Sequence, residues 1–288
     1  MNALARTDYA PLSLSEAVVS EFMRAGAYVF DERLSERACA ALLADVRRGQ
    51  KIDETLFLSE AEFDAVDSGA AEPRRVAEAV DGKLAFVERA PQIVEALWSL
   101  LGPDYRILDR QVVCLLPEPL IPAWIKRRLE GVGNGELSAF VRPERRDVSY
   151  RARLDLRQEP DAGAKPGEAV TLDLYLHSVT DADAPLRILE GSHRLGAFDA
   201  PANLARTGPG VWRYRNARLG DLRLTERPVI ADAGCAVLRH GWTLSGDAQG
   251  AQTARISLQY RFGRGATRQA GVDTVNAWLA GPASVAAA

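Results

Sequence analysis

Two residues of opposite charge, Arg157 and Glu159, are the first candidates for chemistry in this chain. They lie two positions apart in a segment expected to be extended, so their side chains should share one face of a strand. Inside a β-structure, the Arg157 guanidinium could bind a substrate carboxylate or phosphate through paired hydrogen bonds. Glu159 could then act as a general base if burial made its carboxylate more basic. The alternative is a static salt bridge, which adds little stability because desolvation offsets the Coulomb attraction.

The chain has three histidines, His177, His193 and His240, and histidine is the usual acid or base near neutral pH. His193 lies in a Gly-Ser-His turn, where a structural hydrogen bond is the expected role. His240 is five positions before Ser245, so on a regular strand the two side chains face opposite sides. We therefore expect His240 in the core or at the surface. A metal site rebuilt from His177, His240 and Glu159 is conceivable, but the spacing does not favour it.

Composition excludes several classes of function. The 288 residues are 47% hydrophobic, which is enough for one large domain or two small ones. Lys+Arg 36 against Asp+Glu 39 leaves a net charge of −3, so no basic surplus favours nucleic acid. Cys39, Cys114 and Cys235 are widely separated and are expected to be buried thiols in a reducing compartment. No signal-peptide core or membrane-length apolar run is present, so we expect a cytoplasmic protein with a small-molecule substrate and no membrane partner.

The elements that must position these residues change character near Tyr105. Before it, apolar spacing predicts helices over 14–24, 35–48 and 91–101, with a short strand at 27–31. After it, a strand at 106–117 and a short helix at 121–130 precede six alternating runs typical of an antiparallel sandwich or barrel. These runs are 148–157, 169–179, 185–191, 224–231, 235–244 and 254–262. This order predicts a mainly β, α+β fold.

Two segments, 183–196 and 234–263, resemble a known family. The first runs from a strand into Gly191-Ser192-His193, and the second contains LRHGWTLSG followed by Arg255-Ile256-Ser257. In this order they resemble the C-terminal half of phytanoyl-CoA dioxygenase-like Fe(II)/2-oxoglutarate oxygenases. The resemblance covers most of the chain and implies a double-stranded β-helix (jelly roll, cupin-like) with N-terminal helices packed on one face. It also implies a single domain over 1–288, with a mainly helical buttress at 1–104 and a jelly-roll core at 105–266. The small residues at 281–288 are separately expected to form a frayed tail.

The chain departs from this family at the iron site. The family holds Fe(II) with a His-x-Asp pair and a later His, and the matching positions here are Arg157-Gln158-Glu159 and Ser245. A guanidinium is a permanent cation, glutamate is one methylene longer than aspartate, and serine is a poor Fe(II) ligand beside imidazole. A register four residues earlier, Arg153-Leu154-Asp155, remains open and restores no histidine. The resemblance thus implies a degenerate metal-binding triad that disfavours Fe(II).

Arg255 and Ser257 match the Arg-x-Ser that holds the distal carboxylate of 2-oxoglutarate in this family. Here they could hold that acid, a related acid or a substrate carboxylate, and the alternative is an ion pair between Arg255 and a nearby acid such as Asp247. Ser245 could donate a hydrogen bond to a substrate oxygen or simply fill space. The segment 124–128, with one Trp and three basic residues, could form a lid over the barrel mouth or a solvated surface helix.

The leading hypothesis is a metal-independent enzyme, derived from the oxygenase scaffold, that acts on a small acidic or oxygenated metabolite in a biosynthetic pathway. It would isomerise, cyclise or eliminate by acid/base chemistry. Arg157 and Arg255 would anchor the substrate beside Ser245, Glu159 would move the proton, and no cofactor would be required. The alternatives are a non-catalytic, ligand-binding pseudo-oxygenase and an unconventional Fe(II)/2-oxoglutarate hydroxylase.

Overall fold

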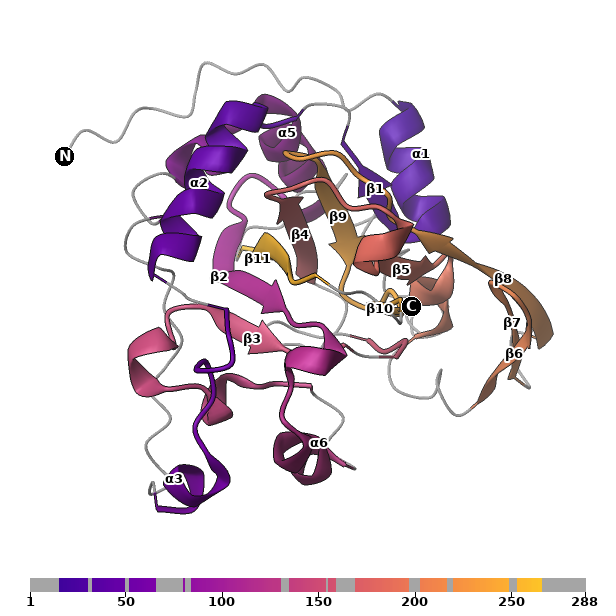
Figure 1. The fold of residues 1–288 in the computed structure, drawn as a ribbon. Helices are drawn as coiled ribbons and strands as arrows, with labels where there is room; N and C mark the ends of the chain where they lie inside the picture. Colours follow the sequence, from indigo (N-terminus) through magenta and orange to yellow (C-terminus); the bar gives the residue numbers. More distant parts are fainter. Residues whose placement is uncertain are drawn as a thin grey trace.

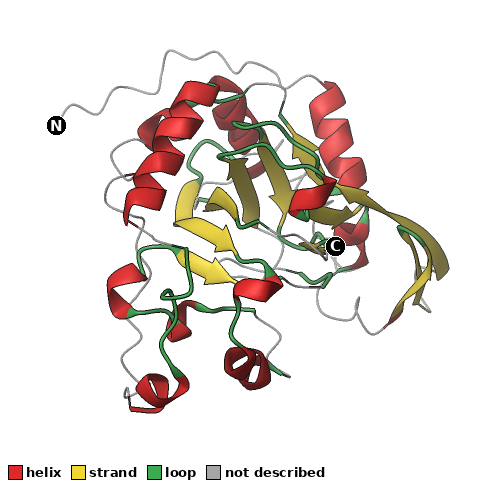
Figure 2. Cartoon of the chain, in the orientation of Figure 1, coloured by secondary structure: helices red, strands yellow, loops and turns green. Residues whose placement is uncertain are grey.

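Two β-sheets with helices on one side form the body of the molecule in the computed structural model (Figure 1, Figure 2). The structure describes residues 16–30, 33–49, 52–65, 80, 84–130, 135–153, 155–158, 169–196, 203–216, 220–248 and 253–265. The α-helices are α1 (Glu16–Ala25), α2 (Glu36–Gly49), α3 (Glu60–Ala65), α5 (Pro91–Leu101) and α6 (Ala123–Leu129). The strands are β1 (Ala27–Val29), β2 (Arg106–Leu115), β3 (Ser149–Arg151), β4 (Ala169–Tyr175), β5 (Leu186–Leu189), β6 (Leu204–Gly208), β7 (Val211–Asn216), β8 (Gly220–Pro228), β9 (Ala236–His240), β10 (Ser245–Asp247) and β11 (Arg255–Gly263).

The strand order confirms the expected double-stranded β-helix. The larger sheet has the order β1-β9-β4-β11-β2-β3, and its neighbours are antiparallel except for β2 and β3. The smaller sheet has the antiparallel order β10-β5-β8-β7-β6. Figure 1 shows α1, α2 and α5 together on one side of the larger sheet, while β6, β7 and β8 extend away from the body. β1 also comes from the front of the chain, so that region adds a strand as well as helices.

Alternation along β11 shows how the larger sheet serves two faces. Ile256, Leu258, Tyr260 and Phe262 belong to the main apolar core, which also contains buried residues of α2 and α5. The intervening side chains, including Ser257, point to the other face. Burying an aliphatic or aromatic side chain stabilises a fold by about 1.5–3 kcal/mol. The helices therefore pack against the apolar face of the sheet. The polar face is left for the space between the two sheets.

Most predicted elements are confirmed, and three differences follow from long-range pairing. The predicted strand 148–157 leaves the sheet after Arg151, and Arg157 returns only as an isolated bridge to Ser245. The predicted strand 235–244 ends at His240 as β9, and the next strand, β10, begins at Ser245 in the other sheet. β6 and β7 were not predicted, although β7 alternates Trp212 and Tyr214 with arginines and Tyr214 is buried in a small apolar cluster. The predicted frayed tail lies outside the described residues.

The predicted buried cysteines and surface helix can also be placed. Cys39, Cys114 and Cys235 are all buried and free, and burial raises the pKa of Cys114 to about 12. Helix α6 packs on α3, with the Trp124 and Phe63 rings 5.5 Å apart, and its residues are not among the described lining of the pocket between the sheets. This arrangement agrees with the surface helix of the two predicted alternatives. In the part of the chain that the structure describes, no helix is long and apolar enough to cross a membrane.

His193 fixes the end of α1 to the body of the fold. Its Nε2 lies 3.1 Å from the Met23 carbonyl oxygen, which can only accept, so Nε2 carries the proton. Burial, aided by the charge of Arg194, lowers the pKa of His193 to about 4. The His240 ring lies 5.5 Å away, and its Nδ1 accepts from the Trp242 backbone N–H at 3.1 Å. The expected structural role of His193 and the expected core position of His240 are both confirmed.

The protein should therefore lose stability as the pH falls from about 6.5 to about 4. Below 6.5 the unfolded chain protonates this imidazole, whereas the folded protein keeps it neutral down to about 4. The difference lowers the free energy of unfolding by about 3 kcal/mol across this window. Urea denaturation at several pH values measures the loss. His193→Gln keeps an N–H donor but cannot titrate, so its profile should be flatter, and an unchanged profile would contradict the assignment.

Candidate functional site

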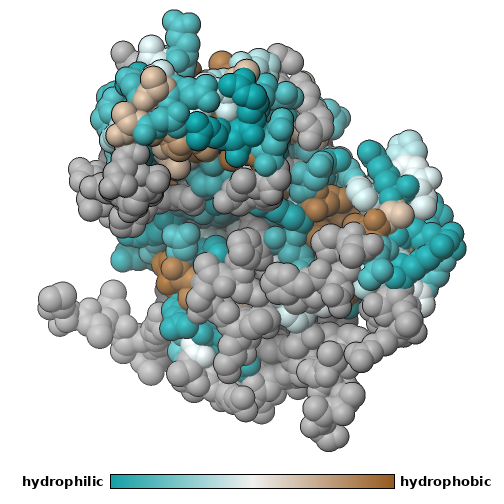
Figure 3. All heavy atoms as spheres, turned by 90° about the horizontal axis from the view of Figure 1, so that it is seen from below, coloured by the Kyte–Doolittle hydropathy of each residue, from teal (hydrophilic) through white to brown (hydrophobic). Residues whose placement is uncertain are grey.

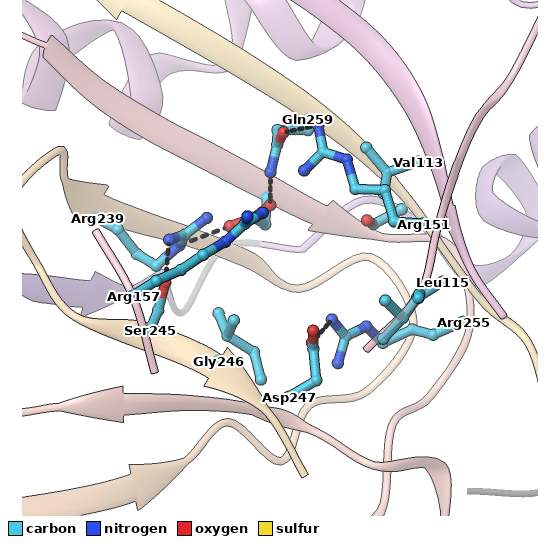
Figure 4. Close-up of a pocket in the computed structure, with 14 residues that line it drawn as sticks. Val113, Leu115, Arg151, Arg157, Arg239, Ser245, Gly246, Asp247, Arg255 and Gln259 are labelled. Atoms are coloured by element: carbon cyan, nitrogen blue, oxygen red, sulfur yellow. Dashed lines mark hydrogen bonds and ion pairs between the residues drawn. The ribbon is translucent and has the colours of Figure 1, made fainter. Parts of the chain in front are cut away.

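A pocket lies between the two sheets, and most of its wall is polar (Figure 4). It is lined by Val113, Leu115, Arg151, Ala152, Arg157, Asp173, Leu186, Arg239, Ser245, Gly246, Asp247, Arg255, Ser257 and Gln259. The structure thus brings together Arg157, Ser245, Arg255 and Ser257, which the sequence singled out from distant segments. Glu159, the predicted base, lies outside the described residues. The roles of all five remain predictions.

Arg157 and Ser245 face each other across the pocket rim through their backbones. Each donates its N–H to the carbonyl oxygen of the other at 2.9 Å. Gln158 points the other way, and its Nε2 donates to the carbonyls of Gly196 at 2.8 Å and Trp242 at 3.1 Å. Because these hydrogen bonds are made by the backbone, they hold Arg157 at the pocket independently of the conformation of its side chain.

The alternative register lies elsewhere in the structure. Asp155 is exposed, and neither it nor Arg153 lines the pocket. Arg153 is half-buried and donates from Nη1 to the Ala248 carbonyl at 2.8 Å. Of the two candidate positions, 153 and 157, it is Arg157 that lines the pocket.

A buried network centred on Asp173 forms one end of the pocket. Its carboxylate accepts from Arg239 Nε at 2.8 Å and from Gln259 Nε2 at 2.9 Å. Arg239 also donates from Nη1 to Ser245 Oγ at 2.8 Å, and Arg151 donates from Nη2 to Gln259 Oε1 at 3.3 Å. Figure 4 shows the Arg157 guanidinium lying along this network beside Arg239.

The sequence reasoning missed Asp173 and Arg239. The signal that could have found them is a charged residue inside an otherwise apolar strand. Such a residue is expected to be buried, and a buried charge needs a partner. Both strands, AVTLDLY and AVLRH, have this pattern. The identity of the partner could not be predicted, because β4 and β9 are far apart in the chain.

Arg255 sits at the other end of the pocket in an ion pair. It donates from Nη2 to Asp247 Oδ1 at 2.6 Å and from Nη1 to the Ala184 carbonyl at 2.7 Å. Burial opposes its charge, but Asp247 and the Tyr175 hydroxyl outweigh that effect, so the pKa of Arg255 is raised. The predicted alternative, an arginine paired with Asp247, is confirmed. Ser257 lies two positions along the same strand and also faces the pocket.

Among the described lining residues of the pocket, arginines outnumber carboxylates. Its lining includes four arginines (151, 157, 239 and 255) and two aspartates (173 and 247), and each aspartate is bonded to a guanidinium. The described lining residues include no imidazole and no aromatic ring. His177 lies outside the pocket, where its Nε2 accepts from the Ile256 N–H at 3.1 Å. Guanidinium groups in a buried setting suit carboxylate or phosphate ligands.

The side chains in the described part of the chain do not fit a non-heme iron site. Such a site needs imidazole and carboxylate ligands that converge on one metal. No group of three His, Cys, Asp or Glu side chains that could hold a metal occurs among the described residues. In the pocket both carboxylates are instead engaged by arginines, and a third arginine, Arg157, adds a further positive charge.

No protein-family model and no curated protein matches the chain. Solved structures do match. AviO1 from Streptomyces viridochromogenes Tue57 has a TM-score of 0.51 and 14% identity, with 88% of this chain and 96% of that chain covered. The non-heme alpha ketoglutarate dependent epimerase SnoN from nogalamycin biosynthesis has a TM-score of 0.50 and 15% identity, with 86% and 82% covered. EctD from S. alaskensis has a TM-score of 0.50 and 14% identity, with 89% and 80% covered.

At these identities the likeness defines the fold. The chain has a double-stranded β-helix of the kind that SnoN uses. Its pocket lies between the two sheets of this fold.

Proposed function

We propose that this protein is a metal-independent enzyme that binds a small acidic or oxygenated metabolite between its two sheets and moves a proton on it. The reaction would be an isomerisation, cyclisation or elimination within a biosynthetic pathway. The observation that carries the proposal is the pocket wall, where arginines outnumber carboxylates and no imidazole appears among the described lining residues. SnoN, a non-heme alpha ketoglutarate dependent epimerase from nogalamycin biosynthesis, supports a biosynthetic reaction other than hydroxylation on a fold of this kind.

Each of these pocket residues would have a separate role. Arg157 would hold the acidic group of the substrate in a charge-assisted fork. The Ser245 hydroxyl accepts from Arg239 and keeps its own proton to donate to a substrate oxygen. Glu159, two positions beyond Arg157, would take a proton from the substrate and return it at another position. Arg255, held by Asp247, would supply a fixed positive wall and a second anchor through its remaining N–H groups.

A non-catalytic binding protein is the second candidate, and one observation favours it. Both carboxylates in the described lining are held by guanidinium groups, which leaves Glu159 as the proposed base. An interaction protein without a ligand is less well supported. The exposed large hydrophobic residues in the described ranges, Ile107, Leu120 and Ile230, lie on separate elements. In Figure 3 the apolar areas among the coloured residues of the visible face are small and lie apart from one another.

Anaerobic calorimetry with Mn(II), with and without 2-oxoglutarate, tests metal independence. We expect no heat from Mn(II) in either titration, because the described pocket residues offer arginines where a metal needs neutral imidazoles. Mn(II) binding with a micromolar dissociation constant would overturn the proposal and restore the hydroxylase alternative.

Proton exchange in D₂O tests catalysis against simple binding. A panel of small carboxylic acids and phosphate esters is incubated with chelator-treated protein and analysed by mass spectrometry for incorporated deuterium. We expect exchange with at least one member, reduced about 10²–10⁴-fold in Glu159→Gln, the range for loss of a general base. Asp155→Asn changes an exposed nearby acid and should leave the rate unchanged. A panel member that binds without exchange would indicate the non-catalytic alternative.

A further inference from the structure

We infer that Asp247 determines the ligand specificity of the pocket, because its carboxylate occupies the place at Arg255 that a second acidic group of a ligand would need. The pocket then takes ligands with one acidic group and a neutral oxygen, and it excludes dicarboxylates, 2-oxoglutarate among them. This inference rests on the proposed ligand-binding role of the pocket. It adds the class of chemical group that the Arg255 end accepts.

The guanidinium of Arg255 is already engaged within the protein (Figure 4). It donates from Nη2 to Asp247 Oδ1 at 2.6 Å and from Nη1 to the Ala184 carbonyl oxygen at 2.7 Å. Both members of the ion pair are buried. A ligand carboxylate bound in a bidentate manner needs at least one of these two nitrogens. It would have to share that nitrogen with an oxygen that the fold itself supplies.

The charge of Arg255 is also balanced by Asp247. Burial opposes the guanidinium charge, but Asp247 and the Tyr175 hydroxyl outweigh that effect and raise the pKa of Arg255. A second carboxylate at Arg255 would lie beside that of Asp247, and like charges in a buried site repel each other. A neutral hydroxyl or carbonyl oxygen meets no such repulsion. The ion pair therefore discriminates between an acidic and a neutral group at this end of the pocket.

The backbone around Asp247 is held in place by two arginines outside the described pocket lining. The Asp247 carbonyl oxygen accepts from Arg187 Nη2 at 2.8 Å, and that of the next residue, Ala248, accepts from Arg153 Nη1 at 2.8 Å. Neither arginine is among the described lining residues, so a ligand that enters the pocket does not compete for these bonds. The position of the Asp247 carboxylate at Arg255 is therefore set by the fold.

Arg153 is the other guanidinium near this ion pair. Burial lowers the pKa of Arg153, and the charges of Asp247 and Arg255 act on it in opposite directions. The short hydrogen bond of Asp247 nevertheless goes to Arg255. Because Arg153 does not belong to the described lining, it offers no alternative place there for the carboxylate of a ligand.

The carbonyl of Ala184 is directed to Arg255 by an unusual backbone conformation. Ala184 has φ 52° and ψ 75°, and it is the only non-glycine residue with a positive φ in the part of the chain that the structure describes. This left-handed conformation is unfavourable for a residue with a Cβ atom, and such strain tends to persist at functional sites. A strained turn and a buried acid thus both satisfy Arg255 without a ligand.

The neighbouring Ser257 suits a neutral oxygen. It lies two positions beyond Arg255 on β11 and also lines the pocket. Its hydroxyl makes no hydrogen bond to the described residues, and a hydroxyl can both donate and accept. Leu115 and Val113 lie opposite these two residues on β2 and also line the pocket. This end therefore fits a short aliphatic chain that ends in a hydroxyl, carbonyl or amide group.

Calorimetry on the full chain with two matched probes tests the inference. Succinate is the dicarboxylate, and succinamate is the same molecule with one carboxylate replaced by a neutral amide. In buffer with a chelator, the parent should not bind succinate with a dissociation constant below about 1 mM. Asp247→Ser opens the place at Arg255, so succinate affinity should rise at least about tenfold, the effect of one charge-assisted hydrogen bond. Succinamate affinity should change by less than about threefold, because no new charged contact is made.

Two further variants locate the new affinity and control for charge. Asp247→Ser combined with Arg255→Gln should lose the gain in succinate binding. Asp221→Ser makes the same change in net charge at an exposed ion pair with Arg213, and it should leave succinate affinity unchanged. If Asp247→Ser does not unfold cooperatively by circular dichroism, Asp247→Asn takes its place. That variant keeps the size of the side chain and removes its charge, so the same direction of change is expected.

Succinate binding by the parent with a dissociation constant below about 1 mM would overturn the inference. So would an unchanged succinate affinity in the folded Asp247 variant, a gain that survives Arg255→Gln, or an equal gain for succinamate. The titrations need neither metal nor turnover, so their failure leaves the acid/base proposal standing. Absence of proton exchange in D₂O would, in turn, leave the succinate result standing.

Discussion

Replacing Asp173 with alanine should lower the free energy of unfolding by about 3–5 kcal/mol, the range for removing one partner of a buried ion pair. Asp173 is 6% exposed, and its carboxylate accepts from Arg239 and Gln259. Without it, the guanidinium groups of Arg151, Arg157 and Arg239 share one wall of the pocket with no lining carboxylate among them. Desolvated like charges repel, so the loss should lie at the upper end of that range. Urea denaturation at pH 7, followed by circular dichroism, measures it.

A double variant separates the charge effect from the loss of packing. Asp173→Ala combined with Arg239→Met removes both members of the pair and leaves no new buried charge from it. Replacing a buried pair by apolar groups is often neutral or stabilising, so the double variant should recover much of the loss. A double-mutant cycle then gives the coupling free energy between the two residues. A loss below about 1 kcal/mol in Asp173→Ala, or no recovery in the double variant, would show that the pair does not determine stability.

Local signals predicted individual elements well. Helix α5 was predicted at its observed bounds, because Pro91 suits the first turn and Gly102 ends the helix with a positive φ. The strand β11 was predicted from alternation, since its two faces meet an apolar core and a polar pocket. These features depend on neighbours in the sequence. Strand pairing does not depend on sequence neighbours. The sequence therefore could not predict that β1 lies at the edge of the larger sheet or that β3 pairs parallel to β2.

The candidate site was predictable only where a resemblance supplied the alignment. Arg157, Ser245, Arg255 and Ser257 were placed in one pocket on that basis, and the structure brings them together there. The single strand expected through Arg157 is an isolated bridge instead, because the chain leaves one sheet after β3 and meets the other at Ser245.

Charge balance in the pocket could not be predicted from the sequence. It depends on which carboxylate meets which guanidinium across strands that are distant in the chain. Asp247 was named beforehand as a possible partner of Arg255 because it lies close in sequence. Asp173 and Arg239, on non-adjacent segments, were not paired. The pairing of charged groups among the described residues of the pocket therefore comes from the fold and not from the sequence pattern.

Gly234→Ala should be the most damaging single-methyl change near the pocket, with an expected loss of about 2–5 kcal/mol. Gly234 has φ +84°, a left-handed conformation that costs an alanine about 1–2 kcal/mol. An added Cβ would also meet the Leu34 carbonyl oxygen, so overpacking adds about 1–3 kcal/mol. Leu34 donates its N–H to the Gly234 carbonyl at 3.0 Å, and Gly234 donates to the Tyr175 carbonyl at 2.8 Å. The clash therefore falls on the contact that joins the start of α2 to the strand β9, which carries Arg239.

Gly220→Ala is the matched control for this prediction, because Gly220 has φ +74° but no atom within 4 Å of an added Cβ. Its free energy of unfolding should fall only by the cost of the left-handed backbone conformation, about 1–2 kcal/mol. The difference between the two variants then measures the close approach of Leu34 to Gly234. Thermal and urea unfolding of both variants supply the comparison. Equal losses would mean that the Leu34 segment moves away without cost, and that β9 is positioned by its sheet neighbours alone. A larger loss in Gly234→Ala would show that the contact between Leu34 and Gly234 helps to position β9, which carries Arg239.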